Sequence, residues 1–396
     1  METQKLMEKS QEHICQTYSR FNVVMSRGSG CYLWDQEGRE YLDFVAGIAV
    51  CNLGHCPSEV AQVLYEQAQQ LVHVSNLYYT EPQVKLARSL TGACFADKVF
   101  FCNSGAEANE AALKLARKYS RMRYGPGRYG VISMKNSFHG RTLATLSATG
   151  QQKVHEGFEP LVDGFRYVDF NRLESVADAI DRTTCAVLVE PIQGEGGVIV
   201  PDEDYLAGLR EICSRQDVLL IYDEIQVGMG RTGKLFAHQH ENVAPDIMTL
   251  AKALANGIPM GAMLTTDVVA EAFTPGSHAS TFGGTPLVTA VANEVFRQIS
   301  QDGFLDRVRS MGAYFRDQLL ALQEKYSFIR EVRGRGLILG MELEFPGSEV
   351  VSLCQERGAL INCTAEKVLR FLPPLIVTRK EVDRLTEILE AIFVQM

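Results

Sequence analysis

The sequence predicts an α/β protein: a large domain with a mostly parallel sheet flanked by helices, and a smaller α+β domain. Three observations lead to this prediction. The chain has 396 residues, more than the roughly 250–300 at which one hydrophobic core usually stops growing. Short apolar runs alternate with amphipathic stretches from about residue 55 to 265, as in repeated βα units. After about residue 287, strands and helices occur in separate groups, which is typical of α+β structure.

Six apolar runs are candidate strands of the large domain. Their near-continuous hydrophobicity, without alternation, predicts strands that are buried on both faces. Between two of them, EANEAALKLARKY places apolar residues at 108, 111, 112, 115 and 119, along one face of a helix. The runs are VFFCN (99–103), VISM (131–134), CAVLVE (185–190), VLLIYDE (218–224), IMTLAK (247–252) and GAML (261–264).

The remaining segments give the expected domain limits. Residues 1–50 contain a probable hairpin, GCYLWDQEGREYLDF, with its turn at DQEGRE. This hairpin could pack with either domain, and we expect it to pack with the smaller one. Residues 51–286 are expected to form the large domain. Residues 287–396 are expected to form the small one, with helices at 287–300 and 304–325 and a helical tail.

Charge and composition exclude several classes of protein. The net charge is −9, with 39 Lys and Arg against 48 Asp and Glu, so nucleic acid is not an expected partner. The polar N-terminus lacks the apolar region of a signal peptide, and no stretch approaches the ~20 apolar residues of a membrane span. Ten cysteines without a C-x-x-C pair indicate a reducing compartment, so we expect a cytoplasmic protein. His238-x-His240 lacks a third ligand, and no metal is expected.

Two neighbouring strands end in residues that can do chemistry. VLLIYDE ends in Asp223 and Glu224, and IMTLAK ends in Lys252. Because the carboxyl ends of parallel strands meet at one edge of a sheet, these side chains should lie close together. An acid and an amine suit a protonated heteroaromatic nitrogen and an imine-forming lysine. A structural ion pair is the alternative.

Two loops that follow candidate strands could bind a flat, phosphorylated ligand. In NSGAEANE (103–110), Ser104, Gly105 and Ala106 are small, so backbone N–H groups could approach a phosphate, although an ordinary helix N-cap would look the same. In SFHGRT (137–142), Phe138 could stack on a ring and Arg141 could bind a carboxylate. A plain loop with a surface arginine and a core histidine is the alternative.

A G-x-G-x-x-G match at 228–233 suggests a dinucleotide site instead. Glu224 and Gln226 lie in the preceding turn, where a carboxylate would repel a pyrophosphate. The residues that follow show no clear helical stripe and include Pro245. An NAD-dependent oxidoreductase is therefore kept only as an unfavoured alternative.

Taken together, eight motifs resemble those of the class III aminotransferases, enzymes of fold type I that use pyridoxal 5′-phosphate (PLP). Three segments are most similar to the acetylornithine aminotransferases of arginine biosynthesis: GMGRTGKLFAHQH, FTPGSHASTFGG and LINCTAEKVLRFLPPL. Ala106 and Thr285 stand where this family usually has Thr and Asn. The motifs, in family order, are YLDFVAGIAVCNLGH, FCNSGAEANEAALKLAR, SFHGRT, EPIQGEGG, DEIQVGMGRTG, PDIMTLAKAL, GSHASTFGG and VLRFLPPL.

The resemblance implies a role for each matching residue. Lys252 would form the imine with PLP, and Asp223 would keep the pyridine nitrogen protonated. Thr281 matches a phosphate ligand that this family supplies from the neighbouring subunit, which implies a homodimer. The implied cofactor contacts are Ser104, Gly105, Ala106, Phe138, Asp223, Glu224, Ile225, Gln226, Lys252 and Thr281.

The implied substrate contacts are Arg141, Ser280, Glu195 and Arg370. Arg370 would bind the α-carboxylate of glutamate, and Glu195 would mask it when the other substrate is bound. The implied reaction transfers the terminal amino group of N2-acetyl-L-ornithine to 2-oxoglutarate, giving N-acetyl-L-glutamate 5-semialdehyde and L-glutamate. Related donors remain alternatives: ornithine, succinylornithine, succinyldiaminopimelate and 4-aminobutyrate. A non-catalytic PLP-fold binding protein is disfavoured because Lys252 and Asp223 are both present.

Overall fold

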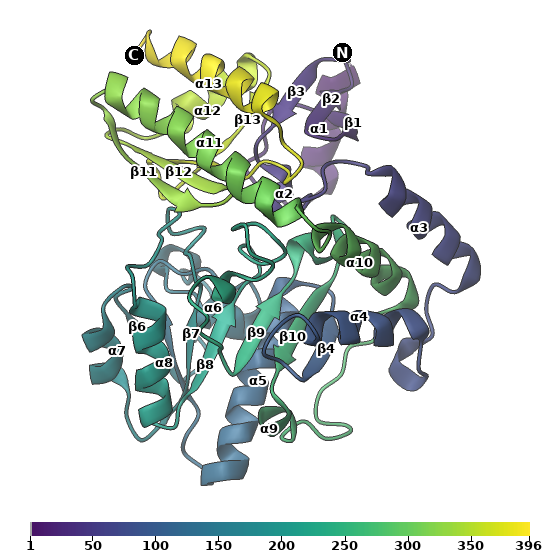
Figure 1. The fold of residues 1–396 in the computed structure, drawn as a ribbon, viewed down its shortest axis with the longest axis vertical. Coiled ribbons are helices and arrows are strands. Elements are labelled where there is room, and N and C mark those ends of the chain that lie inside the picture. Colours follow the sequence, from purple (N-terminus) through teal and green to yellow (C-terminus); the bar gives the residue numbers. More distant parts are fainter. Residues whose placement is uncertain (1) are drawn as a thin grey trace.

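A seven-stranded sheet forms the centre of the larger part of the molecule in the computed structural model, which describes residues 2–396 (Figure 1). The strand order is β4-β10-β9-β8-β7-β5-β6. Strands from β9 to β6 pair in parallel, and only β10 runs antiparallel to its neighbours β9 and β4. The mostly parallel sheet predicted from the sequence is confirmed. Its strands are β4 Lys98–Cys102, β5 Gly130–Met134, β6 Phe165–Val168, β7 Thr184–Val189, β8 Leu219–Asp223, β9 Ile247–Leu250 and β10 Gly261–Thr265.

The six predicted strands correspond to six of these seven. Every residue of β5, β7, β8, β9 and β10 is buried, as continuous apolar runs require. The strand that was not predicted, β6, is short and lies at the edge of the sheet. Three of its four residues are only partly buried, so its sequence carries little hydrophobic signal.

Helices cover both faces of this sheet (Figure 1). The predicted helical stripe belongs to α5, where Ala108, Ala111, Ala112 and Leu115 are fully buried and the helix packs on β9 and β10. The helices of this part are α3 Ser58–Gln70, α4 Glu81–Thr91, α5 Gly105–Tyr124, α6 Leu143–Ala148, α7 Leu173–Ala179, α8 Tyr205–Arg215, α9 Asp267–Ala270 and α10 Pro286–Ile299. Single 3-10 turns occur at Ser75–Leu77, Gln152–Val154, Ala237–His240 and Lys252–Ala255.

Helix α10 corrects one domain limit. We expected it to belong to the small domain that begins at residue 287, but it packs against α3 and α4. Its apolar residues Val291 and Val295 share a core with Leu86 and Leu90 of α4. We therefore propose that the small domain begins after α10. The amphipathic pattern showed that one face of this helix is buried, but it contained no information on which element covers that face.

A second, fully antiparallel sheet lies at the other end of the molecule, in the order β11-β12-β15-β14. The helical tail predicted from the sequence is α13, whose apolar side is buried in the same core as Phe315 of α11 and Phe371 of β15. The elements are α11 Phe304–Lys325, β11 Ile329–Arg335, β12 Ile338–Leu343, α12 Ser348–Glu356, β14 Asn362–Thr364, β15 Val368–Phe371 and α13 Arg379–Phe393.

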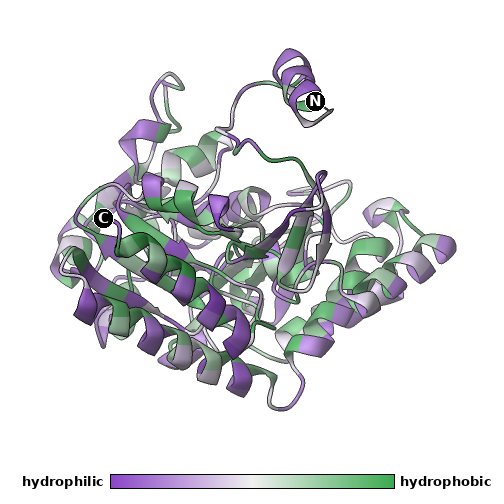
Figure 2. Ribbon diagram, turned by 90° about the horizontal axis from the view of Figure 1, so that it is seen from above, coloured by the Kyte–Doolittle hydropathy of each residue, from purple (hydrophilic) through white to green (hydrophobic). Residues whose placement is uncertain are grey.

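The N-terminal segment packs with this C-terminal sheet and its helices. The hairpin forms as β2 and β3, and β3 pairs in parallel with β13 from the C-terminal region. Leu42 and Phe44 enter the core around Phe315. Helix α1 is largely hydrophilic and extends away from the body (Figure 2). The elements are α1 Glu2–His13, β1 Met25–Ser29, β2 Tyr32–Asp35, β3 Glu40–Asp43, α2 Ala46–Ala49 and β13 Ala359–Leu360.

Within residues 2–396, none of the helices combines the length and the apolar character needed to span a bilayer.

Candidate active site

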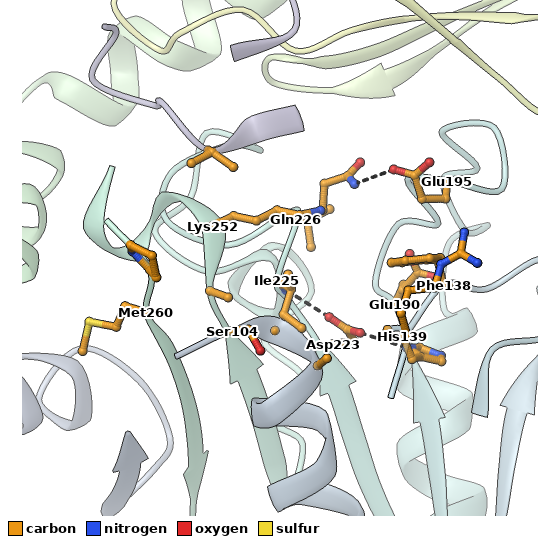
Figure 3. A pocket seen from close by; sticks show the side chains of 18 of the residues that line it. Ser104, Phe138, His139, Glu190, Glu195, Asp223, Ile225, Gln226, Lys252 and Met260 are labelled. Atoms are coloured by element: carbon orange, nitrogen blue, oxygen red, sulfur yellow. Dashed lines mark hydrogen bonds and ion pairs between the residues drawn. The ribbon is translucent and has the colours of Figure 1, made fainter. Parts of the chain in front are cut away.

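A cavity of about 410 Å³ opens at the carboxyl ends of β8 and β9 (Figure 3). Asp223 ends β8, and Lys252 follows β9 by two residues, so the parallel sheet brings them to one edge as expected. The predicted site residues that line the cavity are Ser104, Gly105, Ala106, Phe138, Arg141, Glu195, Asp223, Ile225, Gln226 and Lys252.

The Asp223 carboxylate is held by three donors from different parts of the chain. Its Oδ2 atom accepts hydrogen bonds from Asn109 Nδ2 and His139 Nδ1, both at 2.8 Å, and its Oδ1 atom accepts one from the Ile225 backbone N–H at 3.1 Å. Thr249 in turn donates to Asn109 Oδ1 at 2.8 Å. Figure 3 shows Asp223 lying between Ile225 and His139. The carboxylate is thus fixed before any ligand binds.

Lys252 is a partly buried amine in a strained position. It begins a 3-10 turn with φ of 46°, a left-handed conformation that costs a non-glycine residue about 1 kcal/mol or more. Burial lowers its pKa, and Arg370 adds to this effect, whereas Glu195, Asp223 and Glu190 act in the opposite direction. In Figure 3 its side chain extends through the cavity toward Gln226. A lowered pKa makes the neutral amine, which is the nucleophilic form, more available.

The N-terminus of α5 forms one wall of the cavity. Ser104 is the N-cap, and its hydroxyl accepts a hydrogen bond from the Glu107 backbone N–H at 3.2 Å. A Cβ atom on Gly105 would lie 2.8 Å from Cδ1 of Ile225, so only glycine allows this close packing. The free N–H groups at the start of a 20-residue helix are suited to an anion such as a phosphate.

Glu190 was missed in the sequence, although a signal was present. It follows β7 directly, as Asp223 ends β8. Its carboxylate accepts hydrogen bonds from the backbone N–H groups of Phe138 at 3.1 Å and Gly194 at 3.3 Å. Burial raises its pKa well above the ordinary value, and the nearby Asp223 charge raises it further. A polar residue at the end of an apolar run is the same pattern that identified Asp223 and Lys252.

Asn109 and His139 were harder to find. Both are fully buried, but Asn109 lies inside a helix between Ala108 and Glu110, where its sequence context gives no sign of a partner. His139 is the histidine of SFHGRT, whose sequence is compatible with a core residue as well as a functional one. The structure shows that it contacts Asp223 and that its Nε2 atom is buried without a hydrogen-bond partner in the described part of the chain.

Glu195, which lines the cavity, pairs with Arg370 of β15, although the two residues are 175 positions apart in the sequence. Glu195 Oε1 lies 2.6 Å from the Arg370 NH1 nitrogen. Gln226 bridges the pair: its Nε2 donates to Glu195 at 3.3 Å and its Oε1 accepts from Arg370 at 3.2 Å. Burial acts to raise the pKa of Glu195, but the charge of Arg370 and these hydrogen bonds outweigh it, and the pKa is lowered.

Four predicted residues do not line the cavity: Glu224, Ser280, Thr281 and Arg370, the last of which contacts the lining residues Glu195 and Gln226. The Glu224 carboxylate points away from it and accepts hydrogen bonds from the backbone N–H groups of Ala237 and His238 and from His238 Nδ1. Its side chain is therefore engaged inside the protein, and its expected role as a cofactor contact stays a prediction. Ser280 contacts the site only through its hydroxyl, which accepts from Asn103 Nδ2 at 3.2 Å. Thr281 is exposed at the surface.

The G-x-G-x-x-G segment is part of a buried junction. Arg231 is fully buried and donates to the carbonyls of Leu337 and Pro373, and also to Asn52. No α-helix follows the segment, only the 3-10 turn Ala237–His240, so the geometry of a dinucleotide site is missing. Across residues 2–396, the structure contains no group of three or more potential metal-binding side chains.

Comparison with known proteins agrees with this geometry. The family model described as class-III aminotransferase matches residues 14–393. The acetylornithine aminotransferase of Caldanaerobacter subterraneus is 49% identical over 380 residues, 96% of each chain. That of Methanocaldococcus jannaschii is 47% identical over 399 residues, which is the full length of both chains.

Solved structures are similar over the same range. The ornithine aminotransferase of Toxoplasma gondii has a TM-score of 0.96 at 36% identity, covering 99% of this chain and 95% of that one. The N-acetylornithine aminotransferase of Stenotrophomonas maltophilia has a TM-score of 0.85 at 39% identity, covering 98% of both. The resemblance read from the motifs is confirmed, and the chain belongs to the class-III aminotransferase family.

Proposed function

We propose that this enzyme is a PLP-dependent aminotransferase that moves the terminal amino group of N2-acetyl-L-ornithine to 2-oxoglutarate. The observation that carries the proposal is one cavity lined by a partly buried lysine, a fixed aspartate, a helix N-terminus and Glu195, which is paired with Arg370. The curated relatives at 47–49% identity, named as acetylornithine aminotransferases, support the choice of substrate.

The residues present fit PLP. The α5 N-terminus at Gly105 offers backbone donors for a phosphate, and Asp223 offers a buried anion for a protonated ring nitrogen. Lys252 offers an amine for the aldehyde, and Phe138 offers an aromatic face. When bound, PLP supplies an aldehyde carbon for the amino group and an electron-withdrawing ring that stabilises negative charge on the adjacent carbon.

Lys252 then has two tasks. Its amine would hold the cofactor, and when free it would accept and return a proton at its Nζ atom beside the bound substrate. Its lowered pKa favours the neutral form that accepts this proton. Asp223 keeps a negative charge opposite the ring nitrogen, and its three fixed donors preserve this orientation during the reaction.

The Glu195–Arg370 pair lets one cavity accept two substrates. Glutamate presents its α-amine and needs cations for two carboxylates, whereas acetylornithine presents its terminal amine and has one carboxylate and a neutral amide. With Arg370 masked by Glu195, the cavity suits acetylornithine. When Glu195 turns away, Arg370 can bind the α-carboxylate of glutamate or 2-oxoglutarate.

A homodimer belongs to the same proposal. Leu77, Tyr78, Tyr79 and Phe282 are 62–98% exposed, and large apolar side chains gathered on a surface mark an interface. The two segments that carry them are adjacent, because Asn76 Nδ2 donates to the carbonyls of Ser280 and Gly283 at 3.0 Å. Thr281 lies in this surface, where a second copy could bring it to the neighbouring phosphate. Analytical ultracentrifugation should give about twice the chain mass of 44.0 kDa, and a monomer at micromolar concentration would contradict the proposed homodimer.

The ten cysteines are all free, which supports a reducing compartment such as the cytoplasm.

A comparison of amino donors tests the proposed substrate. Acetylornithine, ornithine, succinylornithine and 4-aminobutyrate should each be assayed with 2-oxoglutarate, and acetylornithine should give the highest kcat/KM. Ornithine is the second candidate, because the ornithine aminotransferase of Toxoplasma gondii has the TM-score of 0.96. A tenfold preference for ornithine would replace the proposed donor. PLP joined to Lys252 should give a visible absorption band, and borohydride should abolish this band while it fixes the cofactor on Lys252. Absence of such a band would overturn the PLP assignment.

A further inference from the structure

Two loops form neighbouring parts of the cavity wall. The first, which we call the stacking loop, is residues 135–141 and carries Phe138. The second, which we call the mask loop, is residues 190–197 and carries Glu195. The stacking loop follows β5 and the mask loop follows β7, and these two strands pair in parallel. Both loops therefore leave the sheet at the same edge.

The two loops are in direct contact. Gln193 Nε2 donates to the carbonyl of Lys135 at 2.9 Å. A Cβ atom on Gly196 would lie 2.8 Å from the carbonyl oxygen of Asn136, so the two backbones approach more closely than a side chain at position 196 would allow. Because the loops are packed without a gap at these points, a displacement of one loop is transmitted to the other.

The carboxyl group of Glu190 joins the two loops. Its Oε2 atom accepts a hydrogen bond from the backbone N–H of Phe138, in the stacking loop, at 3.1 Å. Its Oε1 atom accepts one from the backbone N–H of Gly194, in the mask loop, at 3.3 Å. The residue is buried, and its side chain lies next to Phe138 in Figure 3. Because each oxygen serves a different loop, one carboxyl group fixes both loops relative to each other.

Gly194 connects Glu190 with the closed pair of Glu195 and Arg370. A Cβ atom on Gly194 would collide with the side-chain amide of Gln226, so the backbone at this position packs directly on that amide. The same amide donates to Glu195 and accepts from Arg370. If Gly194 moved, this amide would lose its support, and the pair would lose the group that bridges it.

We propose that Glu190 is a positioning residue that holds Phe138 and the mask loop in one arrangement, and that it thereby contributes to the choice between acetylornithine and glutamate. It acts through the two loops rather than through contact with a substrate. Without it, the aromatic face of Phe138 would be less well placed for either substrate, whereas a loosened mask would disfavour acetylornithine alone. The first half of the proposal concerns only hydrogen bonds within the chain, and the second half rests on the proposed function.

Hydrogen–deuterium exchange of the holoenzyme without substrate, measured by mass spectrometry of peptides, tests the first half. Glu190→Ala removes both acceptor oxygens, so the peptides that contain Phe138 and Gly194 should exchange at least tenfold faster than in the unchanged enzyme. Glu190→Gln keeps one acceptor oxygen and presents an NH2 group to the other backbone N–H, so at least one of the two peptides should exchange faster. Unchanged exchange of both peptides in either folded Glu190 variant would overturn the proposal.

Asp35→Asn is the matched control for both variants. Asp35 is also a buried carboxylate, and its Oδ1 atom accepts from the backbone N–H groups of Glu37 at 3.0 Å and Arg39 at 2.9 Å. It lies in the N-terminal hairpin and does not line the cavity. Asp35→Asn should change the melting temperature but should leave the exchange of the two cavity peptides as it is. Faster exchange of these peptides in the control, equal to that in Glu190→Gln, would show a general loss of stability and would overturn the proposal.

Steady-state assays with both amino donors test the second half. In Glu190→Gln, kcat should fall for both donors, and the ratio of kcat/KM for acetylornithine over glutamate should fall at least threefold because the mask is loosened. A residue that contributes only to stability would lower the melting temperature and leave this ratio unchanged. An unchanged ratio together with faster exchange would overturn the second half alone. If the unchanged enzyme transfers no amino group, the proposed function fails, and the exchange experiment still decides the first half.

Discussion

Two acidic residues face the same cavity and are held in different ways. Asp223 is 4% exposed and accepts from three donors that all belong to the large domain. Glu195 has a side chain that is 28% exposed, and it is held by Gln226 and by Arg370, which comes from the C-terminal sheet. The first carboxylate has no room to move, whereas the second can exchange its partner for water. The proposed constant charge at Asp223 and the proposed removable mask at Glu195 would need these two different environments.

The largest effect on turnover is expected at Lys252, which lines the same cavity as Asp223 and Glu195. Lys252→Ala should abolish turnover, because the amine that holds the cofactor and the group that moves the proton are lost together. Steady-state assays measure this, and absorbance after dialysis should show PLP retained only weakly through its phosphate. Lys234→Ala, at an exposed lysine, is the control. Turnover near that of the unchanged enzyme in Lys252→Ala would refute the assignment.

Asp223→Asn tests the fixed member of the comparison. A neutral amide cannot keep the ring nitrogen protonated, so kcat should fall by orders of magnitude while the fold is retained. Asp246→Asn is a matched control, because this aspartate accepts from Arg210 and the Leu220 backbone N–H at the opposite end of the sheet. It should change the melting temperature but not the rate per folded enzyme. A loss of less than tenfold in Asp223→Asn, about 1.4 kcal/mol of barrier, would contradict the proposed role.

Glu195→Ala and Glu195→Gln test the movable member. Without the mask, Arg370 stays available to any carboxylate, so glutamate should bind as well or better. Acetylornithine should bind with its own carboxylate on Arg370 and present the blocked nitrogen. The ratio of kcat/KM for acetylornithine over glutamate should fall at least tenfold, about 1.4 kcal/mol.

Single-turnover measurements of each half-reaction give this ratio without the product-release step. Glu342→Ala, which breaks the Arg333–Glu342 ion pair in the C-terminal sheet, is the control. Equal losses for both donors in the Glu195 variants would mean that this residue is only structural.

The smallest effect is expected at Asn109, one of the three donors to Asp223. Asn109→Ala removes one of the three hydrogen bonds to Asp223, while His139 and the Ile225 N–H remain as donors. Loss of a bond to a buried carboxylate costs about 1–3 kcal/mol. The variant also loses the bonds of Asn109 to the His139 carbonyl and to Thr249. The rate should fall severalfold, clearly less than in Asp223→Asn, and the affinity for PLP should fall with it. A rate loss equal to that of Asp223→Asn would show that the three donors do not contribute jointly to holding the Asp223 carboxylate.

The sequence by itself determined the large sheet and its reactive edge. Strands buried on both faces must be apolar throughout, so the runs that end at Asp223 and Lys252 could be found directly, and parallel pairing brings their ends together. Glu190 also stands at the end of a buried apolar run, so the same pattern predicts that it lies at this edge. These residues depend only on local sequence and on a general property of parallel sheets.

The tertiary structure alone decided which remote segments meet. The sequence showed a buried face on α10 but not its packing against α3 and α4, and it contained no sign that Asn109 reaches Asp223. By resemblance Glu195 and Arg370 were a pair, but only the packing of the two sheets places their atoms 2.6 Å apart. An apolar face can pack against many partners of similar area. The contact that forms is selected by shape complementarity between distant segments, and no local sequence pattern contains this information.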